Sequence, residues 1–268
     1  MKIVLLILLF ILGACIGSFL CCQARRLHLR VGKQSKSLGK RSVCLSCRTK
    51  LKWYDNIPIL SWLFLKGKCR KCHKKIGSLE IISEIAFALG FVALGTTIDP
   101  ATASGLDWGI FVSTIVLASI LGFLAIYDGA YGELPTFLLT ISIICAILIV
   151  ALKEWSVLSI TGFSPEIILK PLASAAVLGG IYLILYLVSN GRWVGDGDWL
   201  LGIAIGLALA DPWLALITLF LANLLACLVM APTVKKTKNK KIYFGPFMVI
   251  AFIIVTTFAD FFYYVIGG

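Results

Sequence analysis

Residues 108–127 read WGIFVSTIVLASILGFLAIY, and the residue that follows this run is Asp128. A bilayer core about 30 Å thick is crossed by a helix of about 20 apolar residues, so the run predicts a transmembrane helix. The helix is followed at once by one of only 13 acidic residues in a chain of 268. The place of this carboxylate, at the end of an apolar span, is therefore informative.

Seven further apolar segments lie at 3–23, 81–98, 135–152, 171–189, 199–210, 213–231 and 246–265. Of all residues, 60% are hydrophobic and 14% are charged, whereas soluble domains are about half apolar and about a quarter charged. This composition excludes an ordinary water-soluble enzyme and a disordered chain. We predict an all-α polytopic membrane protein with about eight transmembrane helices. Because 199–210 is short for a span, its helix is expected to begin nearer Asp196 or not to cross completely.

Basic residues are concentrated in two places, between Arg25 and Lys75 and between Lys235 and Lys241. Because Lys and Arg resist translocation, such loops are expected on the cytoplasmic side. With the N-terminus outside, four loops face the cytoplasm: 24–80, 128–134, 190–198 and 232–245. They contain 22 of the 25 Lys and Arg residues. The formal net charge of +12 therefore indicates membrane sidedness and contact with anionic lipid headgroups, and it does not indicate nucleic acid.

Two stretches depart from the simple pattern of spans and loops. Leu12-Gly13-Ala14-Cys15 resembles a lipoprotein cleavage site, but apolar residues continue to Cys22 and end at a basic loop. This pattern indicates a retained span, so residues 1–23 are expected to form the first transmembrane helix. Residues 154–170 contain Pro165 and two glutamates and are expected to form an outside loop.

Four of the nine cysteines form two CxxC pairs, Cys44–Cys47 and Cys69–Cys72, with 21 residues between them. Each CxxC places two sulfurs on one tight turn, and two such turns complete a tetrahedral zinc site. In the reducing cytoplasm, paired thiols are favoured as metal ligands over disulfides. We therefore predict structural zinc at these four cysteines, with no catalytic step because a closed site has no open position. Residues 53–62, between the pairs, are expected to pack on the zinc site or to lie at the membrane interface.

Two aspartates lie at the ends of predicted spans. Asp128 follows the third apolar segment, and Asp198 lies in Gly195-Asp196-Gly197-Asp198, where the short sixth segment begins. On the predicted topology they share one membrane depth, and two carboxylates brought together there would share a proton. An aspartic protease needs that state, because one carboxylate takes a proton from water while the other group protonates the scissile carbonyl. The residues alone leave open whether Asp198 or Asp196 is the partner of Asp128, and whether these acids simply face water.

Several motifs follow one another along the chain: Gly17-Ser18-Phe19-Leu20 with Arg26-Leu27, the CxxC pairs around Asn56-Ile57-Pro58-Ile59-Leu60-Ser61-Trp62, Asp128 with Pro135, Gly195-Asp196-Gly197-Asp198, and Phe244-Gly245-Pro246-Phe247. In their order, spacing and membrane sidedness they resemble the bacterial type IV prepilin peptidases, which are membrane aspartyl proteases of the GxGD type. The resemblance covers most of the chain. It implies that Asp128 and Asp198, rather than Asp196, are the catalytic residues.

The same resemblance implies an enzyme of the bacterial inner membrane that cuts the leader of prepilin or pseudopilin precursors, after a Gly, on the cytoplasmic face. It also implies N-methylation of the new N-terminal residue with S-adenosylmethionine, in the region 24–80, beside a multi-span protease core at 81–268. The residues that would bind this cofactor are not identified, and no glycine-rich Rossmann loop is found.

The chain departs from the family pattern at four places, none of which is a catalytic aspartate. The departures are Thr136 for the Asp after Pro, Leu200 for Lys, Cys21 for Asn, and Leu79-Glu80-Ile81 for the Arg-Tyr-Pro that precedes the acid matching Glu84. Three of them bear on the methyltransferase activity, which therefore rests on the resemblance alone.

Three alternatives belong to other classes. A presenilin or signal-peptide-peptidase type of intramembrane protease also uses Tyr-Asp and GxGD, but the zinc loop and the lack of Pro-Ala-Leu argue against it. A membrane thiol oxidoreductase would use the CxxC pairs and be indifferent to loss of Asp128. A zinc-stabilised scaffold of the secretion machinery would leave the acids solvated.

Overall fold

The structure is a computed structural model that describes residues 1–31, 43–44, 46–161, 164–234 and 243–267. The chain divides into two compact units, residues 1–95 and 96–268. Within the described residues every named element is a helix, and the only strand-like pairings are two isolated antiparallel bridges. The prediction of an all-α fold is therefore confirmed.

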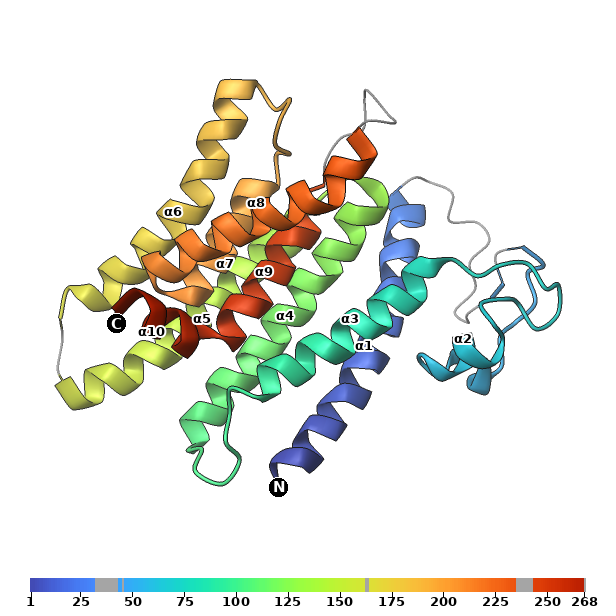
Figure 1. Cartoon of the computed structure of the whole chain (residues 1–268), viewed down its shortest axis with the longest axis horizontal. Helices are drawn as coiled ribbons and strands as arrows, with labels where there is room; N and C mark the ends of the chain where they lie inside the picture. The colour runs from blue at the N-terminus through green and yellow to red at the C-terminus, as the bar shows by residue number, and fades with distance from the viewer. Residues whose placement is uncertain (32–42, 45, 162–163, 235–242, 268) are drawn as a thin grey trace. The chain divides into compact units, whose positions relative to one another are not determined.

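The first unit is a pair of long helices joined by the cysteine loop (Figure 1). Helix α1 (Lys2–Val31) packs along α3 (Ser78–Gly95). The contact depends on two glycines of α1, because an added Cβ would lie 2.5 Å from the Phe87 carbonyl oxygen at Gly13 and 2.7 Å from the Ser83 carbonyl oxygen at Gly17. Small residues spaced four apart let two helix backbones touch in this way.

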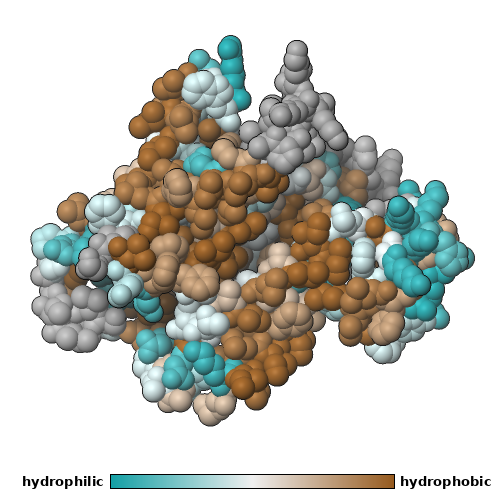
Figure 2. Space-filling model, viewed as in Figure 1, coloured by the Kyte–Doolittle hydropathy of each residue, from teal (hydrophilic) through white to brown (hydrophobic). Residues whose placement is uncertain are grey.

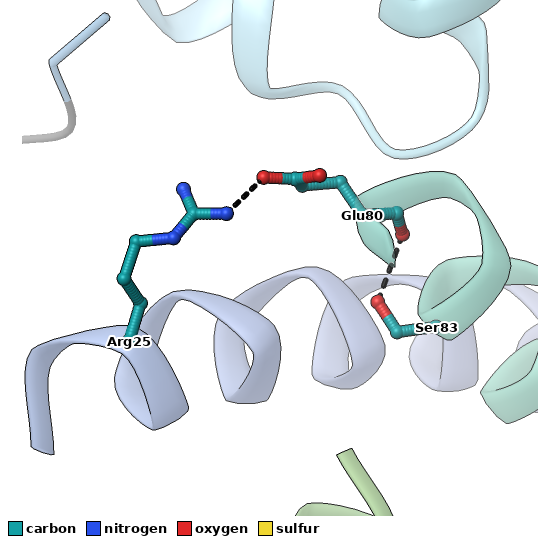
Figure 3. Close-up of polar contacts among 3 residues, drawn as sticks. All are labelled: Arg25, Glu80 and Ser83. Atoms are coloured by element: carbon teal, nitrogen blue, oxygen red, sulfur yellow. Dashed lines mark hydrogen bonds and ion pairs between the residues drawn. The ribbon is translucent and has the colours of Figure 1, made fainter. Parts of the chain in front are cut away.

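At the loop end of this pair, polar side chains join the two helices (Figure 3). Arg25 of α1 forms an ion pair with Glu80 of α3, and the Ser83 hydroxyl donates to the Glu80 carbonyl oxygen at 2.8 Å. The loop itself contains the short helices η2 (Trp53–Asn56) and α2 (Leu60–Phe64). The ion pair therefore connects α1 and α3 at the end where the cysteine loop joins them.

In the part of the chain that the structure describes, the second unit contains seven helices in chain order: α4 (Gly105–Tyr131), α5 (Thr136–Thr161), α6 (Glu166–Ser189), α7 (Asp198–Leu209), α8 (Pro212–Val234), α9 (Gly245–Thr257) and α10 (Ala259–Gly267). Its core is built from fully buried aliphatic side chains such as Leu121, Leu178 and Ile205. Helix α4 begins with a capping box, in which Ser104 Oγ accepts from the Asp107 amide and the Asp107 carboxylate accepts from the Ser104 amide. Such a box satisfies two of the free amides at a helix start.

Helix α7 is short, with 12 residues and hence a length of about 18 Å. It packs on α6, where a Cβ added at Gly206 would lie 2.6 Å from the Ser174 carbonyl oxygen. A Cβ added at Gly202 would lie 3.0 Å from the Leu178 carbonyl oxygen. These two glycines repeat the spacing of those in α1, and they again bring two backbones into contact.

Within the described residues, six helices are long and apolar enough to cross a membrane, and the count is seven if a bent pair of helices forms one span. The pair is α9 and α10, which meet at 75°, so the predicted single span 246–265 is broken at Phe258. Each of the eight predicted apolar segments coincides with a helix or with this pair, and α7 is too short to cross alone, as its length suggested. Figure 2 shows apolar, brown side chains over much of the visible helical surface, as expected for helices that face lipid.

The predicted outside loop at 154–170 is wrong for most of its length. Helix α5 continues through Lys153 and Glu154 to Thr161, and α6 already begins at Glu166. Lys and Glu are good helix formers, and Pro165 is compatible with a helix start, so neither feature interrupts the helices. Parts of two predicted cytoplasmic loops, 32–42 and 235–242, lie outside the described residues.

Candidate active site and metal centre

Asp128 lies in the last turn of α4 and is almost completely buried, with 5% of its surface exposed. The helix ends four residues later at Gly132, whose φ of +71° is easily adopted by glycine and whose amide donates to the Asp128 carbonyl oxygen at 2.7 Å. The side-chain Oδ2 of Asp128 accepts a hydrogen bond from the Gly245 amide at 3.0 Å. This bond connects the end of α4 to the start of α9, 117 residues further along the chain.

Asp198 is the first residue of α7 and is 4% exposed. Its Oδ2 accepts a hydrogen bond from the Gly195 amide at 2.8 Å, so the GxGD turn folds back on its own last side chain. A carboxylate is also favoured here by the positive end of the helix dipole. Asp196, two residues earlier, is exposed. Burial therefore separates two aspartates that the sequence alone did not.

The two buried aspartates line the same cavity, which has a volume of about 350 Å³. The rest of the lining comes from the loop between α4 and α5, the loop between α6 and α7, Thr136 and Leu139 of α5, Leu200 of α7, and Tyr243. Glu133, Arg192 and Asp196 are also among the lining residues. The cavity is thus a charged pocket with two buried acids in an otherwise apolar helical unit.

Two glycines bring backbone close to the acids, and a third packs against Leu134 of the cavity lining. A Cβ at Gly245 would lie 2.8 Å from Asp128 Oδ2, and one at Gly195 would lie 3.2 Å from Asp198 Oδ2. At Gly197 the added Cβ would lie 2.6 Å from the Cβ of Leu134. Close packing therefore explains why glycine occupies both glycine positions of the GxGD motif and the glycine position of Phe244-Gly245-Pro246.

The four CxxC cysteines lie in the first unit, in two turns that have the same pattern of backbone hydrogen bonds. In the first turn the Cys44 amide donates to the Thr49 carbonyl oxygen and the Arg48 amide donates to the Cys44 carbonyl oxygen, both at 2.9 Å. In the second turn the corresponding bonds run from Cys69 to Lys74 at 2.9 Å and from His73 to Cys69 at 3.0 Å. Both Arg48 and His73 have a positive φ. The two CxxC pairs thus form two copies of the same turn.

The four sulfurs gather within 4.8 Å of one another. The Sγ atoms of Cys44 and Cys72 are 3.8 Å apart, and those of Cys47 and Cys69 are 4.0 Å apart. A tetrahedral zinc site with Zn–S bonds of about 2.3 Å requires sulfurs about 3.8 Å apart. The cluster could therefore hold a metal ion, and its ligand type and spacing fit zinc.

The electrostatics of the cluster also suit a metal. Hydrogen bonds with the Thr49 side chain and backbone lower the pKa of the Cys47 thiol to about 6. Backbone hydrogen bonds with Cys72 and Lys71 lower the pKa of Cys69. A backbone bond with Lys74 acts in the same direction on Cys72, but burial and the neighbouring sulfurs outweigh it and raise its pKa to about 11. Four sulfurs this close retain a proton unless a cation offsets their charge.

Residues 53–62 contact the second cysteine turn, as one of the two expectations had it. Asp55 accepts from Arg70 at 2.8 Å, and the Arg70 guanidinium lies 5.0 Å from the centre of the Tyr54 ring. Apolar side chains of the segment are exposed, among them Trp53 at 79% and Leu60 at 51%. The segment therefore has one side on the cysteine turn and one exposed apolar side.

A strained turn at Ile59, within this segment, is hydrogen-bonded to α3. Ile59 has φ 64° and ψ −55°, and the Leu60 amide donates across it to the Pro58 carbonyl oxygen at 2.6 Å. This γ-turn is rare for any residue and costly for a β-branched one. The Ile59 amide donates to Glu84 Oε2 at 2.7 Å, and Glu84 is 7% exposed. A buried acid of α3 therefore holds the loop in a conformation that it would not otherwise adopt.

Sequence reasoning missed the Gly245 amide and the Glu84 contact. The first had a signal, because Gly245-Pro246 places a proline in the first turn of a helix, where free amides are available to an acid. The second had none, since the Ile59 conformation is visible only in the structure. Thr136 and Leu200, two of the departures from the family pattern, line the cavity beside Asp128 and Asp198.

The fold and the site define a multi-pass helical membrane protein with a four-cysteine loop and a cavity that contains two buried aspartates. Comparisons with known proteins give its family. Residues 11–98 match the model of the bacterial peptidase A24 N-terminal domain. The chain is 31% identical to the prepilin leader peptidase/N-methyltransferase of Klebsiella pneumoniae over 219 residues, which cover 80% of this chain and 89% of the relative.

Two further relatives have the same name. The chain is 30% identical to the Aeromonas salmonicida protein over 217 residues, 79% of this chain and 69% of the relative. It is 28% identical to the Bacillus subtilis protein over 264 residues, 96% of this chain and 95% of the relative. The chain belongs to the prepilin leader peptidase/N-methyltransferase family. No solved structure is significantly similar to it.

Proposed function

We propose that this protein cleaves the leader peptide of type IV prepilins or pseudopilins, with Asp128 and Asp198 activating water. The single observation that carries the proposal is that these two buried carboxylates line one cavity. The names of the relatives support the substrate class. The geometry supports the mechanism, because a pair of acids that share a proton can act as base and acid at once.

The proposed reaction needs no group beyond the two aspartates and water. One aspartate, as the carboxylate, takes a proton from water while the water oxygen bonds to the scissile carbonyl carbon. The other, as the acid, gives its proton to the carbonyl oxygen, which yields a neutral tetrahedral diol. When the diol collapses, the C–N bond breaks, the amide nitrogen takes a proton from the first aspartate, and a diol hydroxyl returns a proton to the second.

The two amides of the site would hold the aspartates during this cycle. The Gly245 amide donates to Oδ2 of Asp128, and the Gly195 amide donates to Oδ2 of Asp198. Each bond commits one carboxylate oxygen to the backbone and leaves Oδ1 for water or substrate. The backbone therefore orients the pair without supplying a competing charge.

The orientation and the membrane are part of the same proposal. We place the enzyme in the bacterial inner membrane with its N-terminus outside and its active site on the cytoplasmic side. The distribution of Lys and Arg supports this orientation. The basic residues of the loop 24–80 would then lie near anionic lipid headgroups.

The cysteine loop would have a structural role in this proposal. Zinc held by Cys44, Cys47, Cys69 and Cys72 would fix the fold of the loop. It would take no part in catalysis, because a closed four-sulfur site leaves no position for substrate. The domain organisation would be a first span at 1–23, the zinc loop at 24–80 and a protease core at 81–268.

N-methylation of the new N-terminus is a second proposed activity, supported by the names of the relatives. S-adenosylmethionine would supply the methyl group. Among the described residues there is no strand followed by a glycine turn and a helix, so they do not fit a Rossmann cradle for that cofactor. We therefore derive no methyl-transfer step from these residues.

The test is a cleavage assay in membranes with a prepilin that has a Gly–Phe junction. Asp128→Asn and Asp198→Asn should each abolish cleavage, while Asp196→Asn, a matched change on an exposed aspartate of the same cavity, should retain it. Expression and metal content should be unchanged in all three variants. The product mass from the wild type then reports whether a methyl group is added.

Two results would contradict the proposal. Undiminished cleavage by either Asp128→Asn or Asp198→Asn would exclude the paired-aspartate mechanism. Loss of cleavage in Asp196→Asn, with cleavage retained in Asp198→Asn, would show that Asp196 and not Asp198 is the catalytic member of the GxGD motif.

A further inference from the structure

The far end of helix α7, opposite Asp198, is held by side chains from two other helices. Lys153 of α5 donates from Nζ to the Ala208 carbonyl oxygen at 3.0 Å. Ser174 of α6 donates from Oγ to the Gly206 carbonyl oxygen at 2.6 Å. The Gly206 carbonyl also accepts from the Ala210 amide at 3.1 Å, so Ser174 adds a second donor to it. The Ala208 carbonyl lies one residue before the end of α7, where the helix has no amide ahead to complete the ladder, and Lys153 supplies that donor.

Lys153 is the more informative of the two donors. A lysine in an apolar helical unit is costly, and such residues generally pair with an acid or with backbone carbonyls. The positive ammonium group at a helix C-terminus is favoured by the helix dipole. Asp198 at the N-terminus of α7 and Lys153 of α5 beside its C-terminus therefore both complement the dipole of this short helix.

The turn after α7 is part of the same polar corner. The Ser174 hydroxyl also lies 3.2 Å from the Asp211 carbonyl oxygen. The Asp211 carboxylate accepts from the Trp213 amide at 2.8 Å and from the Tyr263 hydroxyl at 3.0 Å. Helices α5, α6, α8 and α10 thus all contribute to holding the point where α7 ends.

This corner adds a polar restraint to a helix that is already packed closely on α6. Gly202 and Gly206 meet α6 without side chains, and Ile203 packs on Gly179 of α6. A regular helix is stiff over this length, and Ala208 lies ten residues, or about 15 Å, from Asp198. A shift at the Ala208 end is therefore transmitted along the axis to Asp198.

We infer that Lys153 is a positioning residue for the proposed peptidase: by holding the C-terminal carbonyl of α7, it sets how far Asp198 projects into the cavity. Lys153 does not line the cavity, so it acts through α7 and not on substrate. The inference rests on the proposed function, because it gives Asp198 the role stated above.

The test compares Lys153→Met, Lys153→Arg and Lys170→Met in the purified full chain, with the Gly–Phe prepilin as substrate. Methionine keeps the length of the side chain and removes the donor, arginine keeps a charged donor, and Lys170 is an exposed lysine of α6 paired with Glu166. Misplacing a catalytic group by about 1 Å can cost about 100-fold in rate. We expect kcat of Lys153→Met to fall about 10- to 100-fold with KM within about twofold.

The two other variants separate positioning from general stability. Lys153→Arg should restore kcat to within about threefold of the wild type, and Lys170→Met should match the wild type. Because Lys153→Met removes only a half-buried charge, the melting temperature of this variant should not fall in proportion to its kcat. If Lys153→Met does not fold, Ser174→Ala tests the same corner, with the same expected loss of kcat at unchanged KM.

Unchanged kcat in Lys153→Met, a rise in KM alone, or an arginine variant as slow as the methionine variant would overturn the inference. Asp198→Asn, measured in parallel, separates this failure from failure of the proposed function. An active Asp198→Asn variant refutes both statements. An inactive Asp198→Asn with a fully active Lys153→Met refutes only the positioning role.

Discussion

Replacing Gly245 by alanine should slow cleavage while leaving the fold intact. The added Cβ would lie 2.8 Å from Asp128 Oδ2 and 3.3 Å from its Cβ and Cγ. Ordinary contacts begin near 3.4 Å, so the oxygen and the start of α9 must separate by about 0.6 Å. A hydrogen bond of 3.0 Å between the Gly245 amide and Asp128 would then lengthen to about 3.6 Å, which is beyond the range of a real bond.

The expected loss of rate follows from this displacement. If misplacement by 1 Å costs about 100-fold, then 0.6 Å costs roughly tenfold or more in kcat. Alanine is the better helix former by about 1 kcal/mol, whereas crowding in a packed site costs about 1–3 kcal/mol. The net loss of stability should therefore be about 2 kcal/mol or less, and most of the protein should remain folded.

The assay is single-turnover cleavage of the Gly–Phe prepilin, with Gly129→Ala as the matched control. Gly129 is the neighbour of Asp128, but a Cβ there would meet only Pro246 Cγ, at an ordinary 3.5 Å. The control should cleave at the wild-type rate. Equal rates for Gly245→Ala and the wild type, in a preparation where Asp128→Asn is inactive, would show that this amide does not position the aspartate.

Three further predictions concern the metal and the helix contacts. The wild type should contain one zinc per chain by elemental analysis. Cys47→Ser should lose this zinc, and the control Cys227→Ser should keep it. An equal zinc content in both variants would refute the assigned ligands. Bound zinc should be released as the pH falls, because protons compete for the four thiolates, and retention of the metal in acid would argue against a thiolate site. Gly206→Ala would place a Cβ 2.6 Å from the Ser174 carbonyl oxygen and should lower the free energy of unfolding by about 1–3 kcal/mol. The control Gly180→Ala, whose Cβ would meet nothing within 4 Å, should leave it unchanged. Equal melting temperatures of the two variants would refute the close α6–α7 contact.

The helices could be predicted because apolar runs of this length have one stable form in a membrane. Each predicted segment is a helix or a bent pair, and the predicted shortness of 199–210 is confirmed by α7. The error at 154–170 arose because Glu154, Pro165 and Glu166 are typical of loops, although each is also compatible with a helix or its first turn. The bend at Phe258 has no proline or glycine to indicate it.

The candidate site could be predicted only in part. Spacing alone gave the gathering of the four cysteines, because each CxxC is a local turn and only two turns had to meet. Shared membrane depth could pair Asp128 with the Gly195–Asp198 motif, but only the family resemblance selected Asp198 over Asp196. The bond from Gly245 to Asp128 and that from Lys153 to Ala208 join residues far apart in sequence. Such contacts depend on how the helices pack, which periodicity does not encode.

The burial of α7 has a consequence for how the protein responds to its bilayer. Asp198, Leu201, Ala204 and Ile205 are all almost fully buried, so α7 is sheltered from lipid by its neighbours. A lipid-facing helix adapts to a thicker or thinner bilayer by tilting, which changes the depth of its residues. Helix α7 is exempt from this hydrophobic mismatch, because protein contacts and not acyl chains set its depth. The carboxylate at its start should therefore keep its level when the lipid composition changes around it.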